Sequence, residues 1–254
     1  MGFRFAPTEG FMMTYEQSDV TYDAIYEDMK DYKREAGVVK RLIGVNRYRH
    51  RSARPIRLLD VACGTGLHLQ HFDERYEIRG LDLSEAQLAV ARKRLPGVQL
   101  DLADMRYFRL GRQFDAVTCL FSAIGHMMTD EDYQAAINRM ASHLAPGGIL
   151  LVEPWLSPDQ WQDGHFSCDH VNLPKLKVTR MTWTRREGRI THLKMHHLVG
   201  RPEGPELIVA EHQTVLRTTE EQLVMFEKAG LAAWFDPAGL NSHGRGVLIG
   251  QIPF

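Results

Sequence analysis

The chain has 254 residues and a formal net charge of −1, with 44% hydrophobic and 25% charged residues. This composition is typical of a globular protein with one large domain, or one domain and a sizeable insertion. The balanced charge excludes a global field that would gather nucleic acid or an anionic membrane. Three scattered cysteines argue against a disulfide framework, and no apolar stretch approaches the length of a membrane span. We therefore expect a cytoplasmic protein.

The N-terminal part is predicted to contain an extension, residues 1–18, followed by a helix over residues 19–42. Tyr22, Ile25, Tyr26 and Met29 recur at the helical spacing of three and four, and Asp19 could cap this helix. The arginine-rich stretch 47–54 is interpreted as a solvated linker, and contact with a phosphorylated ligand is the alternative.

Strand and helix patterns then alternate. Short apolar runs at 57–62, 77–81, 98–102, 114–120 and 149–152 predict strands, and helical segments are expected at 67–72, 85–95 and 130–144. This order indicates an α/β, Rossmann-like fold whose parallel sheet is covered by helices on both faces. Right-handed crossovers place the carboxyl ends of the strands along one edge, where ligands bind.

The pattern changes after Glu153. Three successive strand-like runs, 178–183, 189–199 and 206–216, predict an antiparallel β insertion over residues 155–217. A helix from Thr218 or Thr219 to Ala229, and strands at 231–235 and 246–252, complete the sheet. The Rossmann-like domain is thus expected to comprise residues 19–154 and 218–254.

The strongest motif is the stretch from Asp60 to Gly66, directly after an apolar strand. Its glycines, Gly64 and Gly66, let the backbone turn tightly and approach a ligand, and Ala62 lies in the same turn. The motif lacks the third glycine of the dinucleotide fingerprint and the lysine of a phosphate-binding loop, which favours a ligand without phosphate. A tight strand-to-helix turn without a ligand is the alternative.

Further acidic residues end the next two strands. Asp82, followed by Leu83, is placed to accept the hydroxyls of a ribose, because Ser84 already provides the cap of the next helix. Asp104 could accept the amino group of adenine while Met105 packs on the ring. Phe121 and Ser122 follow the fourth strand at the same edge.

The ordered series of Asp60, Gly64, Gly66, Asp82 and Asp104 resembles class I S-adenosylmethionine methyltransferases. More specific segments resemble the nucleotide-linked aminosugar N-methyltransferases, which act on dTDP-amino-dideoxyhexoses for macrolide and related antibiotics. These segments are residues 22–26, 58–66, 91–96, 104–106, 108–111, 121–126, 153–155 and 244–246.

This resemblance implies roles for individual residues. S-adenosylmethionine is the expected cofactor, with Tyr22 among the residues that hold it. Tyr26 is similar to a tyrosine that lies over the methyl donor and near the acceptor amine, and His126 matches a histidine near that amine. Arg245 resembles the arginine that pairs with the sugar nucleotide's diphosphate. Residues expected to form the acceptor pocket are Tyr26, Ser122, His126, Glu153, Trp155 and Arg245. The insertion is expected to wall this pocket and to support a homodimer.

The chemistry agrees with these roles. Methyl transfer depends largely on holding amine, methyl group and sulfur in line, and the amine must be neutral. His126 has a suitable pKa range to orient it and to take its proton, although it could be a loop residue bonded to the backbone. Tyr26 could equally belong to the core, and Arg245 could be an exposed turn residue.

Three further histidines, His192, His196 and His197, do not predict a metal site. On a strand, the first two would lie roughly 13 Å apart, too far to share an ion. Two other functions stay open: a methyltransferase for another small amine or hydroxyl acceptor, and a cofactor-binding protein without catalysis. A nucleic-acid methyltransferase is not expected, since the Asn/Asp-Pro-Pro-aromatic tetrapeptide is absent from the sequence.

Overall fold

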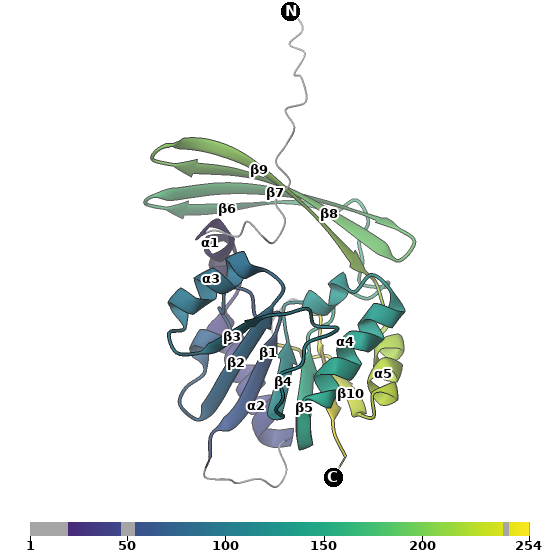
Figure 1. Ribbon diagram of the computed structural model, residues 1–254. Coiled ribbons are helices and arrows are strands. Elements are labelled where there is room, and N and C mark those ends of the chain that lie inside the picture. Colours follow the sequence, from purple (N-terminus) through teal and green to yellow (C-terminus); the bar gives the residue numbers. More distant parts are fainter. Residues whose placement is uncertain (1–19, 47–53, 241–243, 254) are drawn as a thin grey trace, which may run out of the picture.

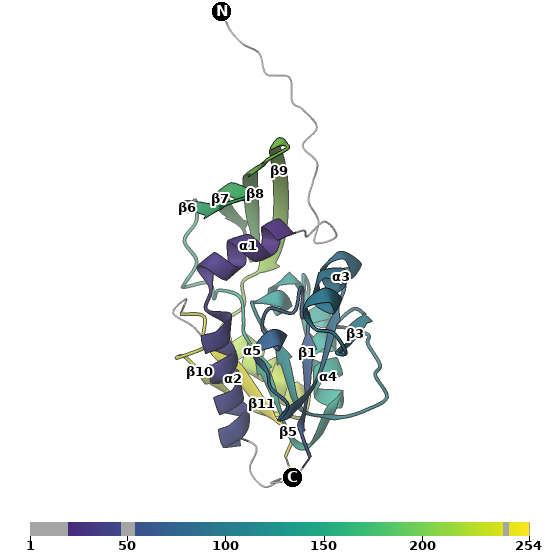
Figure 2. The same cartoon turned by 90° about the vertical axis from the view of Figure 1, so that its left-hand side faces the viewer.

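The computed structural model describes residues 20–46, 54–240 and 244–253, without the side chains of residues 20–22 and Asp28. The predicted extension, residues 1–18, and the linker residues Arg47, Arg49 and Arg51 lie outside these ranges. Within them the chain forms a seven-stranded sheet and a four-stranded sheet, with helix α1, Val20–Met29, between the two (Figures 1 and 2).

The seven-stranded sheet has the order β10-β11-β5-β4-β1-β2-β3. Strand β11 runs antiparallel to β5 and β10, and the other neighbouring pairs are parallel. Because the order reverses between β1 and β4, a crevice opens at the carboxyl ends of these strands. The strands are β1 Ile56–Val61, β2 Tyr76–Asp82, β3 Gln99–Leu102, β4 Phe114–Cys119, β5 Leu144–Val152, β10 Ala232–Asp236 and β11 Val247–Gln251.

Two helix layers cover this sheet, as the alternation of its side chains requires. On β1, Leu58 points into a cluster with α2 and α3, and Leu59 points into one with α4 and α5. Both leucines are fully buried. The helices are α2 Tyr32–Asn46, α3 Glu85–Arg94, α4 Asp130–Ser142 and α5 Thr219–Lys228. The prediction of an α/β, Rossmann-like fold is confirmed.

The single helix predicted over residues 19–42 is wrong, because the chain breaks between α1 and α2. Asp31 accepts a hydrogen bond from the backbone N–H of Arg34 at 2.9 Å, which caps the new helix. The break redirects the chain, so that α1 packs beneath the four-stranded sheet while α2 packs on the seven-stranded one (Figure 2).

Two other boundaries differ from the expectation. The helix expected at 67–72 is only a short 3₁₀ turn, Leu69–His71. Strand β5 begins at Leu144 rather than at Ile149, and the pairing between β4 and β5 shifts register between Phe114 and Ala116. Pro146 and Gly147 are accommodated by this irregularity, with Gly147 at a φ of 71°.

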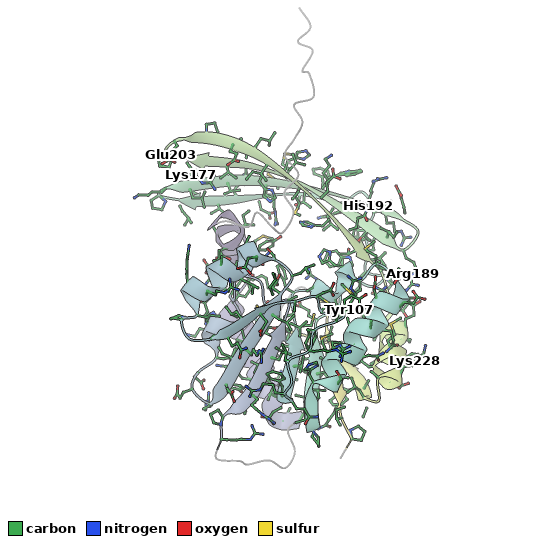
Figure 3. The ribbon with its side chains drawn as sticks, viewed as in Figure 1. Tyr107, Lys177, Arg189, His192, Glu203 and Lys228 are labelled. Carbon is green, nitrogen blue, oxygen red and sulfur yellow. The ribbon has the colours of Figure 1, made fainter. Side chains whose placement is uncertain are left out.

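The four-stranded sheet is an antiparallel meander of β6 Phe166–Leu173, β7 Leu176–Glu187, β8 Ile190–Arg201 and β9 Gly204–Val215. The expectation of three strands omitted β6. Lys177 and Glu203 mark one end of the long strands, and His192 marks the other (Figure 3). His192 and His196 both lie on strand β8, as expected.

Two arginines attach this sheet to the helices. Arg189, in the turn before β8, pairs with Asp130 and Glu221 near the starts of α4 and α5. Arg217 is 2% exposed and pairs with Asp130 at 2.9 Å while donating to the carbonyl oxygens of Met127 and Thr129. The four-stranded sheet is therefore held over the carboxyl edge of the larger sheet (Figure 1). No helix in the described ranges is long and apolar enough to cross a membrane.

Candidate active site

The glycine-rich turn follows β1 and has a left-handed backbone. Ala62, Gly64 and Gly66 have φ values of 60°, 56° and 80°. The N–H of Gly64 donates to Asp82 at 2.8 Å, and a Cβ at Gly64 would lie 2.6 Å from Oε1 of Gln87. Both the φ value and the close contact favour glycine at this position.

The two glycines have different surroundings. Gly64 lines the cavity described below, whereas Gly66 packs against α3, where a Cβ would meet Leu95 at 2.7 Å. Gly66 was expected to contact the cofactor. Its position allows the turn to pack closely against α3, and its contact with the cofactor stays a prediction.

Asp82 lies at the carboxyl end of β2, as expected. Its oxygens accept hydrogen bonds from the backbone N–H groups of Gly64 and Ser84, at 2.8 and 2.9 Å. Burial raises the pKa of Asp82, while these bonds and the N–H of Leu83 counteract the shift. A carboxylate offers about four acceptor positions. An acceptor position therefore remains for an incoming hydroxyl group.

Asp60 is the more deeply buried of the two carboxylates, at 3% exposure. It accepts a hydrogen bond from the Thr118 hydroxyl at 2.7 Å. Burial raises the pKa of Asp60 to about 6, against the opposing effects of His68 and Thr118. An ammonium group in the cavity would favour the charged form of Asp60.

Asp104 has a stronger partner than the sequence suggested. Its oxygens accept from the side chain of Arg106, at 2.6 Å from Nη2 and 3.0 Å from Nε, and from the Arg106 N–H at 2.8 Å. Arg106 also pairs with Asp132. The Arg106 hydrogen bonds lower the pKa of Asp104. An adenine amino group would have to compete with Arg106 for this carboxylate, while Met105 beside it faces the cavity.

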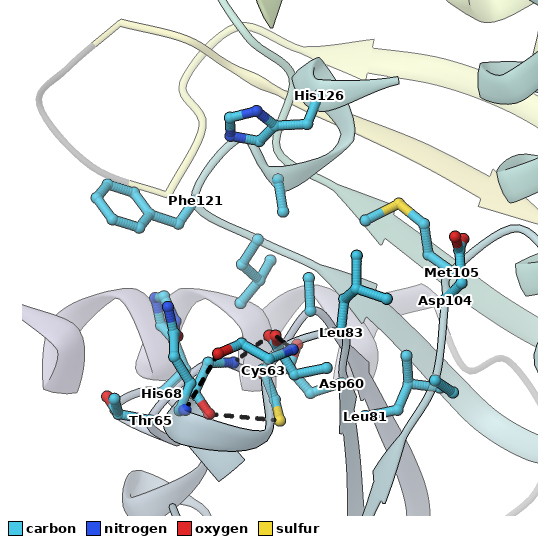
Figure 4. Close-up of a pocket in the computed structure, with 18 of the residues that line it drawn as sticks. Asp60, Cys63, Thr65, His68, Leu81, Leu83, Asp104, Met105, Phe121 and His126 are labelled. Carbon is cyan, nitrogen blue, oxygen red and sulfur yellow. Dashed lines mark hydrogen bonds between the residues drawn. The ribbon is translucent and has the colours of Figure 1, made fainter. Parts of the chain in front are cut away.

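These residues enclose a cavity of about 520 Å³ at the carboxyl edge of the sheet. Figure 4 shows Phe121 and His126 on one side and Asp60, Thr65 and His68 on the opposite side. The predicted site residues that line it are Asp60, Ala62, Gly64, Asp82, Leu83, Asp104, Met105, Phe121 and His126. The predicted residues Gly66, Tyr26, Ser122, Glu153, Trp155 and Arg245 are not among its lining, and the Tyr22 side chain lies outside the described part.

The turn after β4 is strained. Phe121 and Ser122 have φ values of 53° and 59°, which residues other than glycine rarely adopt. The N–H of Phe121 donates to the buried carboxylate of Glu153 at 2.7 Å, and the Ser122 hydroxyl donates to the Pro154 carbonyl at 2.6 Å. Glu153 and Ser122 thus hold the turn that carries Phe121 into the cavity.

The remaining acceptor-side residues gather around this turn. Arg245 donates to the Ser122 hydroxyl at 3.0 Å, and its guanidinium carbon lies 5.0 Å from the centroid of the Trp155 ring. The N–H of the Trp155 ring is buried and makes no hydrogen bond within the described ranges. Three segments distant in sequence, which carry Ser122, Glu153 with Trp155, and Arg245, are therefore brought together beside the cavity.

His126 is oriented by the four-stranded sheet. Its Nδ1 lies 2.9 Å from the carbonyl oxygen of Gln213 on β9, and because a carbonyl only accepts, Nδ1 carries the hydrogen. In the neutral ring Nε2 then holds the lone pair, which can accept a proton. Burial lowers the pKa of His126 below 6.5, partly offset by this bond. His126 thus both bonds to the backbone and lines the cavity, so the two interpretations of this residue are compatible.

Tyr26 lies next to the cavity wall. Its ring packs edge-on against Phe121, with the centroids 5.0 Å apart, and packs against the apolar cluster of α1 and the four-stranded sheet. Tyr26 is therefore partly a core residue and partly a neighbour of the cavity.

Two buried charge clusters were missed by the sequence analysis. Asp23 on α1 accepts from the Thr65 hydroxyl at 2.6 Å and from Arg94 at 2.7 Å. Glu35 on α2 contacts both Lys30 and His68. Asp23 lies three residues before Tyr26 and so shares a helix face with it. A carboxylate on this apolar face was the feature of the sequence that could have indicated a buried charge.

Comparison with known proteins agrees with this geometry. Residues 58–148 match a methyltransferase domain family. The chain is 40% identical over 232 residues to the dTDP-3-amino-3,6-dideoxy-alpha-D-glucopyranose N,N-dimethyltransferase of Streptomyces fradiae, covering 90% of this chain and 88% of that one.

Two solved structures are similar over nearly the whole length. The DesVI protein of Streptomyces venezuelae is 39% identical with a TM-score of 0.83, covering 94% of this chain and 100% of that one. An amino pentose methyltransferase of Micromonospora echinaspora involved in calicheamicin biosynthesis, solved with S-adenosylmethionine bound, is 38% identical with a TM-score of 0.81. This match covers 91% of this chain and 96% of the chain of that structure.

The fold and the cavity define a class I methyltransferase that uses S-adenosylmethionine. The cavity fits this molecule, because carboxylates at the ends of β1 and β2 suit its ammonium and ribose groups and apolar side chains face the space between. More narrowly, the chain belongs to the family of the aminosugar N,N-dimethyltransferases, and it is an S-adenosylmethionine-dependent N-methyltransferase.

Proposed function

We propose that this enzyme methylates the amino group of a dTDP-linked aminodeoxysugar, in the biosynthesis of an antibiotic or related metabolite. The observation that carries the proposal is the juxtaposition of the cavity with Arg245, Ser122 and Trp155 beyond the Phe121–Ser122 turn. The high-coverage relatives support this acceptor, because the enzyme of Streptomyces fradiae is named for a dTDP-3-amino sugar.

On the cofactor side, we assign Asp82 to the ribose hydroxyls and Asp60 to the ammonium group. The turn at Ala62 and Gly64 allows a close approach, and Leu83 and Met105 provide apolar contact. S-adenosylmethionine supplies the electrophilic methyl group when bound. Phe121 closes the cavity toward the acceptor, and we retain Tyr22 and Asp104 as neighbours of the cofactor.

On the acceptor side, we assign the amine to His126 and Tyr26. The Nε2 lone pair of His126 can orient a neutral amine and accept its proton. The ring of Tyr26 restricts the position of the amine, because it packs on Phe121 at the same wall. The main contribution is alignment of the amine with the methyl group.

Arg245 is proposed to bind the diphosphate. An arginine fork suits phosphate oxygens, and the guanidinium is held by stacking on Trp155 and by the one hydrogen bond that Nη1 donates to Ser122. Glu153 and Ser122 hold the strained turn in place, and they also belong to the proposed sugar pocket. The insertion, residues 155–217, walls this acceptor region.

We also propose that the outer face of the four-stranded sheet joins two copies of the chain. Paired positions on this face are apolar and exposed, and such a patch on a charged protein favours association. These residues are Phe166, Met181, Trp183, Leu198 and Leu207. Light scattering should give a dimer, and Trp183→Lys with Leu198→Lys should give a monomer. A monomeric unmodified protein would refute this interface.

The cytoplasm is proposed as the location of the protein, since Cys168 is free and exposed.

The test of the acceptor is mass spectrometry of the products from a panel of dTDP-aminosugars that differ in amine position and stereochemistry. We expect methylation of at least one member, and loss of that activity when the dTDP group is removed. Arg245→Gln should mainly raise the KM for the nucleotide sugar. Equal turnover of the free aminosugar would contradict the proposal.

A further inference from the structure

A buried ionic cluster lies at the junction of α1 and α2. Oε2 of Glu35 is 3.1 Å from Nζ of Lys30 and 2.7 Å from Nε2 of His68. Glu35 is 1% exposed and Lys30 is 7% exposed. Lysine and glutamate are rarely this buried unless their charges are compensated. The cluster therefore needs a physical reason.

The ammonium group of Lys30 is under-coordinated within this cluster. It carries three N–H donors, yet it makes no hydrogen bond of acceptable geometry to the described residues. Its neighbours besides Glu35 are the ring of Phe121, with Nζ 3.9 Å from the centroid, and the ring of Tyr32, at 5.4 Å. Glu35 divides its carboxylate between Lys30 and His68. A further anion is thus the partner that Lys30 lacks.

The cluster adjoins the cavity rather than the protein exterior. Phe121, Tyr32 and His68 all line the cavity, and these are the residues that Lys30 and Glu35 contact. Asp60 lines the same cavity. One region of the cavity therefore has the carboxylate of Asp60 in its lining and the ammonium group of Lys30 behind the ring of Phe121, which suits a ligand that ends in both an ammonium and a carboxylate group.

We propose that Lys30, held in place by Glu35, binds the α-carboxylate of the methyl donor, while Asp60 accepts its ammonium group. The amino-acid end of the donor is a zwitterion, and each of its charges meets the opposite charge in this arrangement. Lys30 then acts as a binding residue, and Glu35 acts as a positioning residue that prevents the ammonium from turning away.

The test compares two ligands by calorimetry: S-adenosylhomocysteine, and its decarboxylated analogue, which retains the ammonium group. The unmodified protein should bind S-adenosylhomocysteine about tenfold or more tightly than the analogue, as a charge-assisted hydrogen bond requires. Lys30→Met should remove this preference by weakening S-adenosylhomocysteine alone. Affinity for the analogue should change less than about twofold.

Lys33→Met is the matched control, because Lys33 is exposed on α2 and should leave both affinities unchanged. If Lys30→Met does not fold, Lys30→Gln provides the same comparison. Undiminished preference for the carboxylate in the Lys30 variant would overturn the proposal. Equal weakening of both ligands would also overturn it, since that result indicates a general structural role. None of these measurements needs the acceptor, so the acceptor proposal stands or fails separately.

Discussion

The guanidinium carbon of Arg180, on β7, lies 5.4 Å from the centroid of the Tyr26 ring on α1. The same guanidinium donates to Asp169 at 2.7 Å and to the sulfur of Met29 at 3.1 Å. Arg180 is 6% exposed, which is unusual for arginine. It therefore joins the four-stranded sheet to the helix whose tyrosine borders the cavity.

Replacing Arg180 should disturb Tyr26 rather than the cofactor. We expect Arg180→Gln to lower kcat about tenfold while the affinity for S-adenosylhomocysteine, measured by calorimetry, changes little. In a Tyr26→Leu background the same replacement should have little further effect on kcat, because the two residues act together. Independent, multiplicative losses would show that Arg180 does not act through Tyr26. Arg185→Gln, exposed on the same strand, is the control.

Asp23 joins α1 to the glycine-rich turn and to α3. Its carboxylate is 5% exposed and accepts from both Thr65 and Arg94. Asp23→Ala should leave Arg94 without its anion and lower the free energy of unfolding by about 3 kcal/mol. Denaturant titration measures this loss. The same replacement should also weaken the binding of S-adenosylhomocysteine. Glu27→Ala, exposed on the same helix, should cost less than about 0.5 kcal/mol. If Asp23→Ala lowered the free energy of unfolding as little as Glu27→Ala, the anchoring role of Asp23 would be refuted.

The edge of the sheet that we assign to the cofactor could largely be predicted from the sequence. Asp60 and Asp82 lie where expected, because the carboxyl ends of parallel strands must share one edge. The alternation of strands and helices determines which residues meet there. Such information is local in the sequence, and it transfers directly to the fold.

Contacts between distant residues could not be predicted in the same way. Asp23 meets Arg94 across 71 positions and Glu35 meets His68 across 33 positions, because three-dimensional packing decides which charges pair. Strand β6 was missed since Asp169 and Asn172 are poor strand formers, and pairing with β7 overrides that preference. The break at Asp31 was missed because the apolar spacing alone does not reveal a change of direction.

Two histidines on the inner side of the four-stranded sheet should make stability depend on pH. Burial lowers the pKa of both His197 and His212 to about 4, from an ordinary value of 6.5. Between these values the unfolded chain binds more protons, so the free energy of unfolding rises with pH. We expect stability to be complete above about pH 6.5 and to fall as the pH approaches 4.

Thermal unfolding from pH 4 to pH 7.5 measures this dependence. The variant His197→Gln, His212→Gln should show a flatter profile over the same range, because neither glutamine titrates. His196→Gln is the control, since His196 adjoins His197 on β8 but is exposed on the opposite face of the sheet. A profile as steep as that of the unmodified protein would assign the acid sensitivity to other groups.

His126 should determine the acid limb of catalysis. Burial lowers its pKa below 6.5, so the neutral ring persists to a lower pH than an exposed histidine would allow. The kcat of the unmodified enzyme should therefore fall only below about pH 6.5, as His126 becomes protonated. His126→Gln retains a hydrogen-bonding group but cannot take a proton, and we expect its kcat to be about 100-fold lower without this limb. Steady-state assays at saturating acceptor measure both effects. If the acid limb persists in His126→Gln, proton acceptance belongs to water or another residue, and His126 serves only to orient the amine.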